Sequence, residues 1–138
     1  MQFAQICDRV EVDDGTGRPL DLSAFPGKWI NSNPDTNGIA RLVISESDGK
    51  LLVQVLAIGP DGLIDWGTTD LTIFAATPLS RIGSGFIGVY DFGFAETRLQ
   101  GSIVKGLLVL AQFHRFKDGS RRVDYFVREY FAMTHGRY

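Results

Sequence analysis

Apolar and polar residues alternate over short stretches of this chain, and turn-forming residues separate each stretch from the next. After Gly27, segments of strand length follow one another, bounded by glycine, proline, asparagine or aspartate. No stretch keeps the 3.6-residue period of an amphipathic helix over about 12 residues. The pattern predicts strands at 28–32, 39–45, 51–58, 71–76, 86–92, 96–103, 105–116 and 122–133.

Short turns join most of these segments. Asp-Gly pairs at 47–50 and 117–120 are typical of tight hairpin turns. A meander of eight antiparallel strands hides its edges best by closing on itself. We therefore predict an all-β protein, an eight-stranded antiparallel up-and-down β-barrel, with room inside for side chains or one small ligand. It would form a single domain over 1–138, with a turn-rich lead-in at 1–26 and the barrel at 27–133.

The last two predicted strands are apolar on both faces. In 122–133, one face holds Val123, Tyr125, Val127, Glu129 and Phe131, and aromatic residues also occur on the other face. A strand that is apolar on both sides is usually covered on both sides. We expect the outside of the barrel to be covered here by the N-terminal segment or by a second copy of the chain, and we favour a homodimer.

Composition and charge narrow the class of protein. The chain has 138 residues, is 44% hydrophobic and carries a net charge of −2, which argues against a nucleic-acid partner. No apolar run approaches the roughly 20 residues of a membrane span, and the first residues do not resemble a signal peptide. The single cysteine, Cys7, cannot form an internal disulfide or a multi-cysteine zinc site. We expect a cytoplasmic protein without a membrane or metal partner.

The start of the first predicted strand, Gly27-Lys28-Trp29 followed by Asn31, resembles the Gly-x-Trp start of the calycin superfamily, the lipocalin and avidin-type barrels. The resemblance implies that Trp29 closes one end of the barrel. It also implies that a basic residue of the last strand packs over Trp29, with Arg128 as the first candidate and Arg122 as the second. In avidin-type barrels the residue matching Asn31 faces the ligand.

Residues 27–67 are also similar to a group of small uncharacterised bacterial proteins. The shared features are a Trp-x-Asn start, a Gly-Ile-x-Arg strand at 38–41 and the ending Asp65-Trp66-Gly67. That group has two cysteines before the Asp-Trp-Gly, where this chain has Gly59 and Ile64. A metal or disulfide role therefore does not transfer.

Several polar residues in apolar strands are candidates for chemistry. His114 could be a general base or a haem ligand, or a hydrogen-bonded strand histidine. Glu129 shares a face with apolar residues, so it is either a buried carboxylate with a functional role or part of a dimer contact. Gln54, on an apolar face, would either orient a ligand or bond a neighbouring strand. Tyr90 and Tyr125 complete the set of predicted ligand contacts, with Trp29, Asn31, Gln54 and Arg128.

The sequence offers no cofactor motif. The sequence motif Gly-x-Gly-x-x-Gly at 83–88 is not followed by a predicted helix, so we expect no nucleotide-binding site there. Our leading interpretation is a barrel that binds a small apolar or aromatic molecule. The alternatives are a cofactor-independent cyclase or isomerase of a natural-product pathway, acting on a polyketide- or terpenoid-like chain through His114 and Glu129, and an interaction module with a filled interior.

Overall fold

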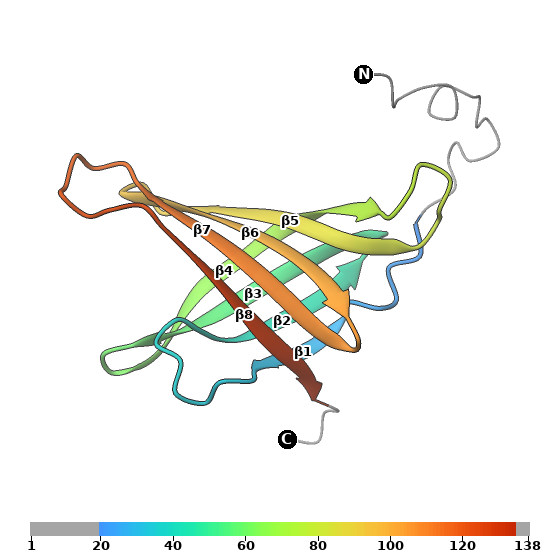
Figure 1. Ribbon diagram of the computed structural model, residues 1–138, viewed down its shortest axis with the longest axis horizontal. Coiled ribbons are helices and arrows are strands. Elements are labelled where there is room, and N and C mark those ends of the chain that lie inside the picture. Colours follow the sequence, from blue (N-terminus) through green and yellow to red (C-terminus); the bar gives the residue numbers. More distant parts are fainter. Residues whose placement is uncertain (1–19, 135–138) are drawn as a thin grey trace.

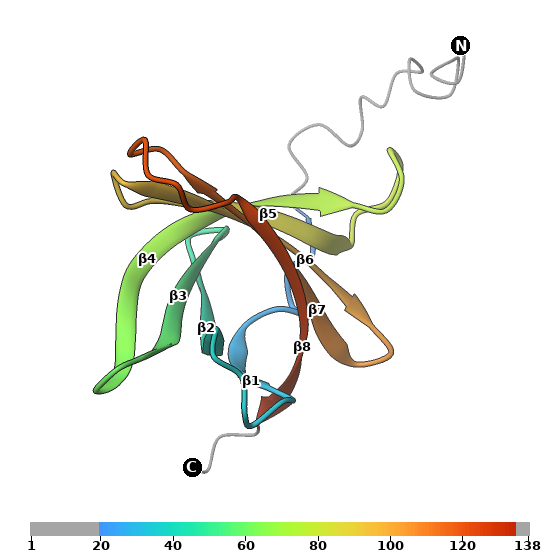
Figure 2. The same ribbon diagram turned by 60° about the vertical axis from the view of Figure 1, so that its left-hand side comes forward.

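The computed structural model of the protein describes residues 20–134, which form one closed barrel (Figures 1 and 2). Each strand pairs antiparallel with the next along the chain, and the first pairs with the last. The predicted all-β, eight-stranded up-and-down barrel is confirmed. The strands are β1 (Gly27–Asn31), β2 (Ile39–Ser47), β3 (Lys50–Gly59), β4 (Gly62–Ala75), β5 (Gly83–Asp91), β6 (Ala95–Val104), β7 (Leu107–Phe116) and β8 (Tyr125–Thr134).

Strand β4 is longer than its sequence pattern predicts, because it begins at Gly62 instead of at residue 71. Gly59 pairs with Gly62, so Pro60 and Asp61 form a tight turn from β3 directly into β4. A bulge opposite Gln54–Leu56 then shifts the register. Most side chains of 62–70 are exposed, and this stretch has no alternation of apolar and polar positions to mark it as a strand. Figure 2 shows how strongly β4 curves.

The tight turns follow the φ angles that their residues allow. Asp48 and Gly49 have φ of 52° and 79°, and Ser47 pairs with Lys50, so the predicted Asp-Gly hairpin is present. Lys105 and Gly106 form a second such turn, with φ of 53° and 83°. The prediction that Lys105 begins a strand is therefore wrong. The segment 117–124 is a longer loop than the tight turn predicted at 117–120.

One end of the barrel, which we call the closed end, is filled by apolar side chains. Phe25 and Trp29 are almost fully buried there, and the Trp29 indole donates a hydrogen bond to the Phe25 carbonyl at 2.9 Å. The Phe25 ring packs edge-on against Phe86, whose own ring lies against the bare backbone of Gly101. A methyl group at Gly101 would overlap that ring, so glycine is required at this position.

The segment before β1 seals this end. The Asp21 amide donates to the Arg81 carbonyl at 2.6 Å, and the Gly83 amide donates to the Asp21 carbonyl at 2.9 Å. Leu22 is also buried. This part of the lead-in therefore closes the barrel end and does not cover the outside of β7 and β8. Cys7 and the rest of the lead-in, residues 1–19, lie outside the described part of the chain.

The outer faces of β7 and β8 remain partly exposed within residues 20–134. Phe113, Phe126 and Tyr130 are 39%, 54% and 43% exposed, and the Phe113 and Phe126 rings contact each other across the two strands. The predicted homodimer would bury this surface.

Candidate functional site

The opposite end of the barrel is hollow, and we call it the barrel mouth. The segments 32–38, 60–61, 92–94 and 117–124 connect strands at this end, on the left of Figure 1. A cavity of about 570 Å³ opens here between the segment 33–39 and strands β3, β4, β7 and β8. An adjoining hollow of about 450 Å³ is more apolar. The two share Ile64, Trp66, His114 and Tyr125.

Five polar side chains form a hydrogen-bonded chain across the barrel mouth, which we call the polar chain. The Thr36 hydroxyl donates to Oε2 of Glu129 at 2.6 Å, and the Gln112 amide donates to Oε1 of Glu129 at 2.9 Å. Oε1 of Gln112 contacts Nε2 of His114 at 3.3 Å, and Nδ1 of His114 contacts the Thr97 hydroxyl at 2.8 Å. The polar chain thus ties the β1–β2 segment to β6, β7 and β8.

The direction of these bonds fixes the tautomer of His114. A carboxylate only accepts, so the Gln112 amide nitrogen faces Glu129 and the Gln112 oxygen faces His114. The His114 proton therefore lies on Nε2, and Nδ1 accepts from Thr97. Burial lowers the pKa of His114 below its usual 6.5, against the attraction of the Glu129 carboxylate. His114 is consequently neutral at pH 7, and both of its nitrogens are engaged within the protein.

Four aromatic side chains lie beside the polar chain, and we call them the aromatic wall: Trp66, Tyr90, Phe92 and Tyr125. Tyr125 stacks on the His114 ring at 4.3 Å between centroids and is half exposed. Trp66 meets Tyr90 and Phe92 edge-on at 5.4 Å and 5.2 Å. Flat apolar faces are therefore presented next to hydrogen-bonding groups, which is the usual composition of a small-molecule site.

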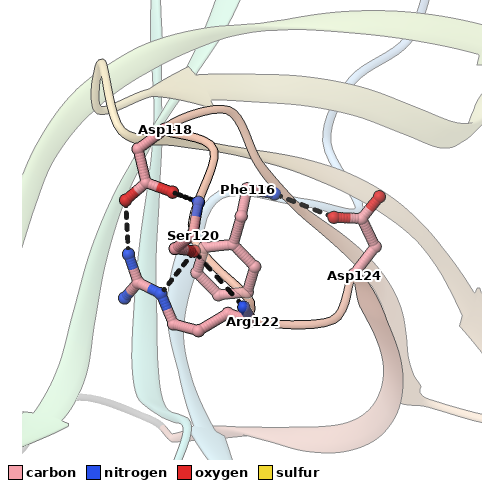
Figure 3. A network of polar contacts seen from close by, with 5 residues as sticks. All are labelled: Phe116, Asp118, Ser120, Arg122 and Asp124. Atoms are coloured by element: carbon pink, nitrogen blue, oxygen red, sulfur yellow. Dashed lines mark hydrogen bonds and ion pairs between the residues drawn. The ribbon is translucent and has the colours of Figure 1, made fainter.

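The β7–β8 loop at the rim is held by its own polar contacts, as Figure 3 shows. The Arg122 guanidinium pairs with Asp118 at 2.7 Å and bonds the Ser120 hydroxyl through Nε at 3.2 Å. The Phe116 amide donates to Asp124 at 2.9 Å. Arg122 also lies 4.4 Å above the centre of the Phe116 ring, so this loop places a cation that is paired with Asp118 against an aromatic ring at the rim.

Two predicted ligand contacts lie inside the barrel but are bonded to the backbone. The buried Asn31 side chain donates to the Ile39 carbonyl at 2.9 Å and accepts from the Asn33 amide at 2.8 Å. Asn31 thereby shapes the segment that presents Thr36. The Tyr90 hydroxyl lies 2.7 Å from the Gly67 carbonyl and 3.1 Å from that of Val53, and burial raises the pKa of Tyr90 to about 12.

Two others lie on the outer surface. Gln54 points outward and donates to Asp65 at 2.8 Å, so it bonds the neighbouring strand, one of the two outcomes expected for it. Arg128 is exposed on the outer face of β8 beside Val109 and Ala111. The expected packing of Arg128 over Trp29 is wrong, because successive strand residues point to opposite faces and Glu129 takes the inward one. Arg122 lies at the barrel mouth, and Trp29 at the closed end.

Of the predicted residues, the structure brings His114, Glu129 and Tyr125 together. Sequence reasoning missed Thr36, Thr97, Gln112 and Trp66 as parts of the same site. The spacing of Gln112 and His114, two residues apart in a strand, places them on one face and was the available signal. Thr36 lies in a turn-rich segment, where no pattern marks a residue that reaches across to β8.

Comparisons with protein-family models, with curated proteins and with solved structures found no match for this chain. Within residues 20–134, no helix is long and apolar enough to span a membrane. The same residues contain no group of three or more histidine, cysteine, aspartate or glutamate side chains placed to hold a metal ion.

Proposed function

We propose that the protein binds one small, largely apolar or aromatic molecule at the barrel mouth. The observation that supports this most is the cavity of about 570 Å³, which flat aromatic faces and the polar chain line together. This volume lies within the range of about 300–1,000 Å³ that is usual for ligand pockets. The aromatic wall would supply most of the affinity, at about 25 cal/mol per Å² of apolar area removed from water.

We further propose that the barrel is calycin-like. The sequential order of eight antiparallel strands and a tryptophan buried at one end are consistent with the resemblance of the Gly27–Asn31 segment. In that arrangement the second end would be the ligand entrance, and the hollow lies at that end.

The binding proposal is tested by native mass spectrometry of the protein purified from its own host. A small molecule retained on the folded chain would support binding and give its chemical class. The number of subunits in the same spectrum tests the homodimer, and a mass equal to a single chain would contradict it.

Intrinsic fluorescence locates the molecule, since the chain has two tryptophans and only Trp66 lies at the barrel mouth. A compound bound there should change the emission of the wild type and of the Trp29→Phe variant. It should leave the emission of the Trp66→Phe variant unchanged. A response that persists without Trp66 would place the compound elsewhere.

One observation favours a second function, a cofactor-independent cyclase or isomerase. His114 and Glu129 both line the cavity, so a reactive chain folded there would lie beside a carboxylate that can exchange a proton. Glu129 is the better candidate for direct transfer, because each of its oxygens accepts one hydrogen bond and keeps a free lone pair, whereas both nitrogens of His114 are engaged. Turnover of the retained molecule that survives both His114→Ala and Glu129→Gln would exclude this function.

A further inference from the structure

We propose that the molecule bound at the barrel mouth carries a protonated amine attached to its aromatic body. This inference rests on the proposed function and deepens it by naming the class of ligand. It follows from the charges around the cavity, from the unused hydrogen-bonding capacity of Glu129, and from the position of the aromatic wall.

The charged side chains that line the hollow are all acidic. Asp35 and Glu129 line the larger cavity, and neither described lining contains a lysine or arginine. Asp65 borders the adjoining hollow, with its carboxylate bonded to Gln54 on the outer surface. His114 adds no charge in its neutral form. Arg122 lies at the rim, where its pairing with Asp118 offsets its charge. A ligand anion would therefore meet only like charges inside, whereas a cation would be attracted.

Glu129 still has room for a donor. An ionised carboxylate offers about four lone-pair sites. Thr36 and Gln112 each donate one hydrogen bond to it. Both donors come from the protein side, and together they hold the carboxylate in one orientation. An ammonium N–H of a ligand would add a third donor, and a charge-assisted bond of this kind is stronger than one from a neutral hydroxyl.

The aromatic wall fits the rest of such a ligand. Trp66 and Tyr125 line the same cavity as Glu129. A flat ring can pack against these faces while its amine reaches the carboxylate. Aromatic faces attract cations as well as apolar surfaces. The wall and the carboxylate therefore favour a ligand whose ring packs against Trp66 and Tyr125 while its amine lies at Glu129.

The test compares three probes with one aromatic body. These are 2-(naphthalen-1-yl)ethylamine, 2-(naphthalen-1-yl)ethanol and naphthalen-1-ylacetate, titrated calorimetrically into the full chain at pH 7. We expect the amine to bind about tenfold tighter than the alcohol, and the acetate to bind weakest, since a tenfold ratio corresponds to one ordinary charge-assisted bond.

Matched variants test whether the Glu129 carboxylate causes the preference for the amine over the alcohol. Glu129→Gln keeps the shape and should bring the amine and alcohol affinities to within about threefold of each other. Glu46→Gln, an exposed position at the far end of β2, removes the same charge and should leave the ratio unchanged. Asp35→Asn removes the carboxylate of an exposed residue that lines the cavity, and should lower the ratio by a smaller factor.

The failures of the two proposals are distinguishable. If the alcohol binds as tightly as the amine, or the acetate binds tightest, the inference about charge is overturned and the aromatic-ligand function stands. An amine preference that survives both Glu129→Gln and Asp35→Asn also overturns it. If none of the three probes binds and no molecule is retained from the host, the proposed function fails together with the inference.

Discussion

The two ends of this barrel are built from the same strands and differ in almost every physical property. The closed end is filled with apolar side chains, and the polar groups of its tryptophan and lead-in segment bond to the backbone. The barrel mouth is hollow, and its polar side chains bond mainly to one another. The comparison indicates that apolar burial at the closed end supplies most of the stability and leaves the barrel mouth available for binding.

The change from apolar to polar inward-facing side chains occurs along single strands. In β7, the buried Leu110 is followed two residues later by Gln112 and then by His114. In β8, which runs the opposite way, Glu129 precedes the buried Phe131. Glu129 pairs with Leu110 in the β7–β8 register and Gln112 pairs with Val127, so the polar inward positions of the two strands are offset by two residues. The polar chain is continuous because the long side chains of Gln112 and Glu129 bridge this diagonal, at 2.9 Å.

The most direct test of the difference in stability between the two ends is to remove one tryptophan from each end. Trp29→Ala would leave a large cavity in the closed end and should lower the free energy of unfolding by about 3–5 kcal/mol. Trp66→Ala removes a half-buried ring from the rim and should lower it by about 1 kcal/mol. Urea denaturation of both variants measures the difference. Equal losses would show that the barrel mouth contributes as much stability as the closed end.

A smaller effect is expected at Tyr90, whose ring is buried beside Trp66. Tyr90→Phe removes a hydroxyl that bonds the Gly67 and Val53 carbonyls, and should destabilise the protein by about 1–3 kcal/mol at pH 8. The folded-state pKa of Tyr90 is about 12 and the unfolded value is about 10. The contribution of the hydroxyl is therefore complete below pH 10 and is lost as the pH rises toward 12.

Urea midpoints at pH 8 and pH 11 check this expectation. The gap between wild type and Tyr90→Phe should narrow at the higher pH. Tyr130→Phe, on the exposed outer face of β8, is the control and should show no change of gap. A gap for Tyr90→Phe that is the same at both pH values would contradict the buried role assigned to this hydroxyl.

The sequence predicted the closed end better than the barrel mouth, for a physical reason. Strand order, the Asp48-Gly49 turn and the burial of Trp29 follow from local patterns of two to five residues. The polar chain instead joins Thr36 to Glu129, which are 93 positions apart, through contacts that depend on barrel closure and register. A slip of one residue would have turned Glu129 outward and Arg128 inward. Local pattern does not determine that choice, and Arg128 was misplaced for this reason.

The smallest effect should come from titration of His114. The folded-state pKa of His114 lies below its usual value because of burial, so the unfolded chain takes up its proton first as the pH falls. Its neutral form therefore contributes stability that is fully present above about pH 6.5. That contribution decreases as the pH drops toward the folded-state value, and the protonated ring would also force the Thr97 hydroxyl to accept where it now donates.

His114→Gln removes this proton uptake and keeps a polar side chain at the barrel mouth. Its urea midpoint should fall less than that of the wild type between pH 7.5 and pH 5.5, because the other titrating groups are common to both proteins. The imidazole nitrogen shifts of the wild type at pH 7.5 should in addition show the proton on Nε2, as the bond to Gln112 requires. Parallel pH profiles would mean that His114 is equally hydrated in both states. The His114 end of the polar chain would then be exposed to solvent in the folded protein. Burial would in that case not distinguish His114 from an ordinary surface histidine.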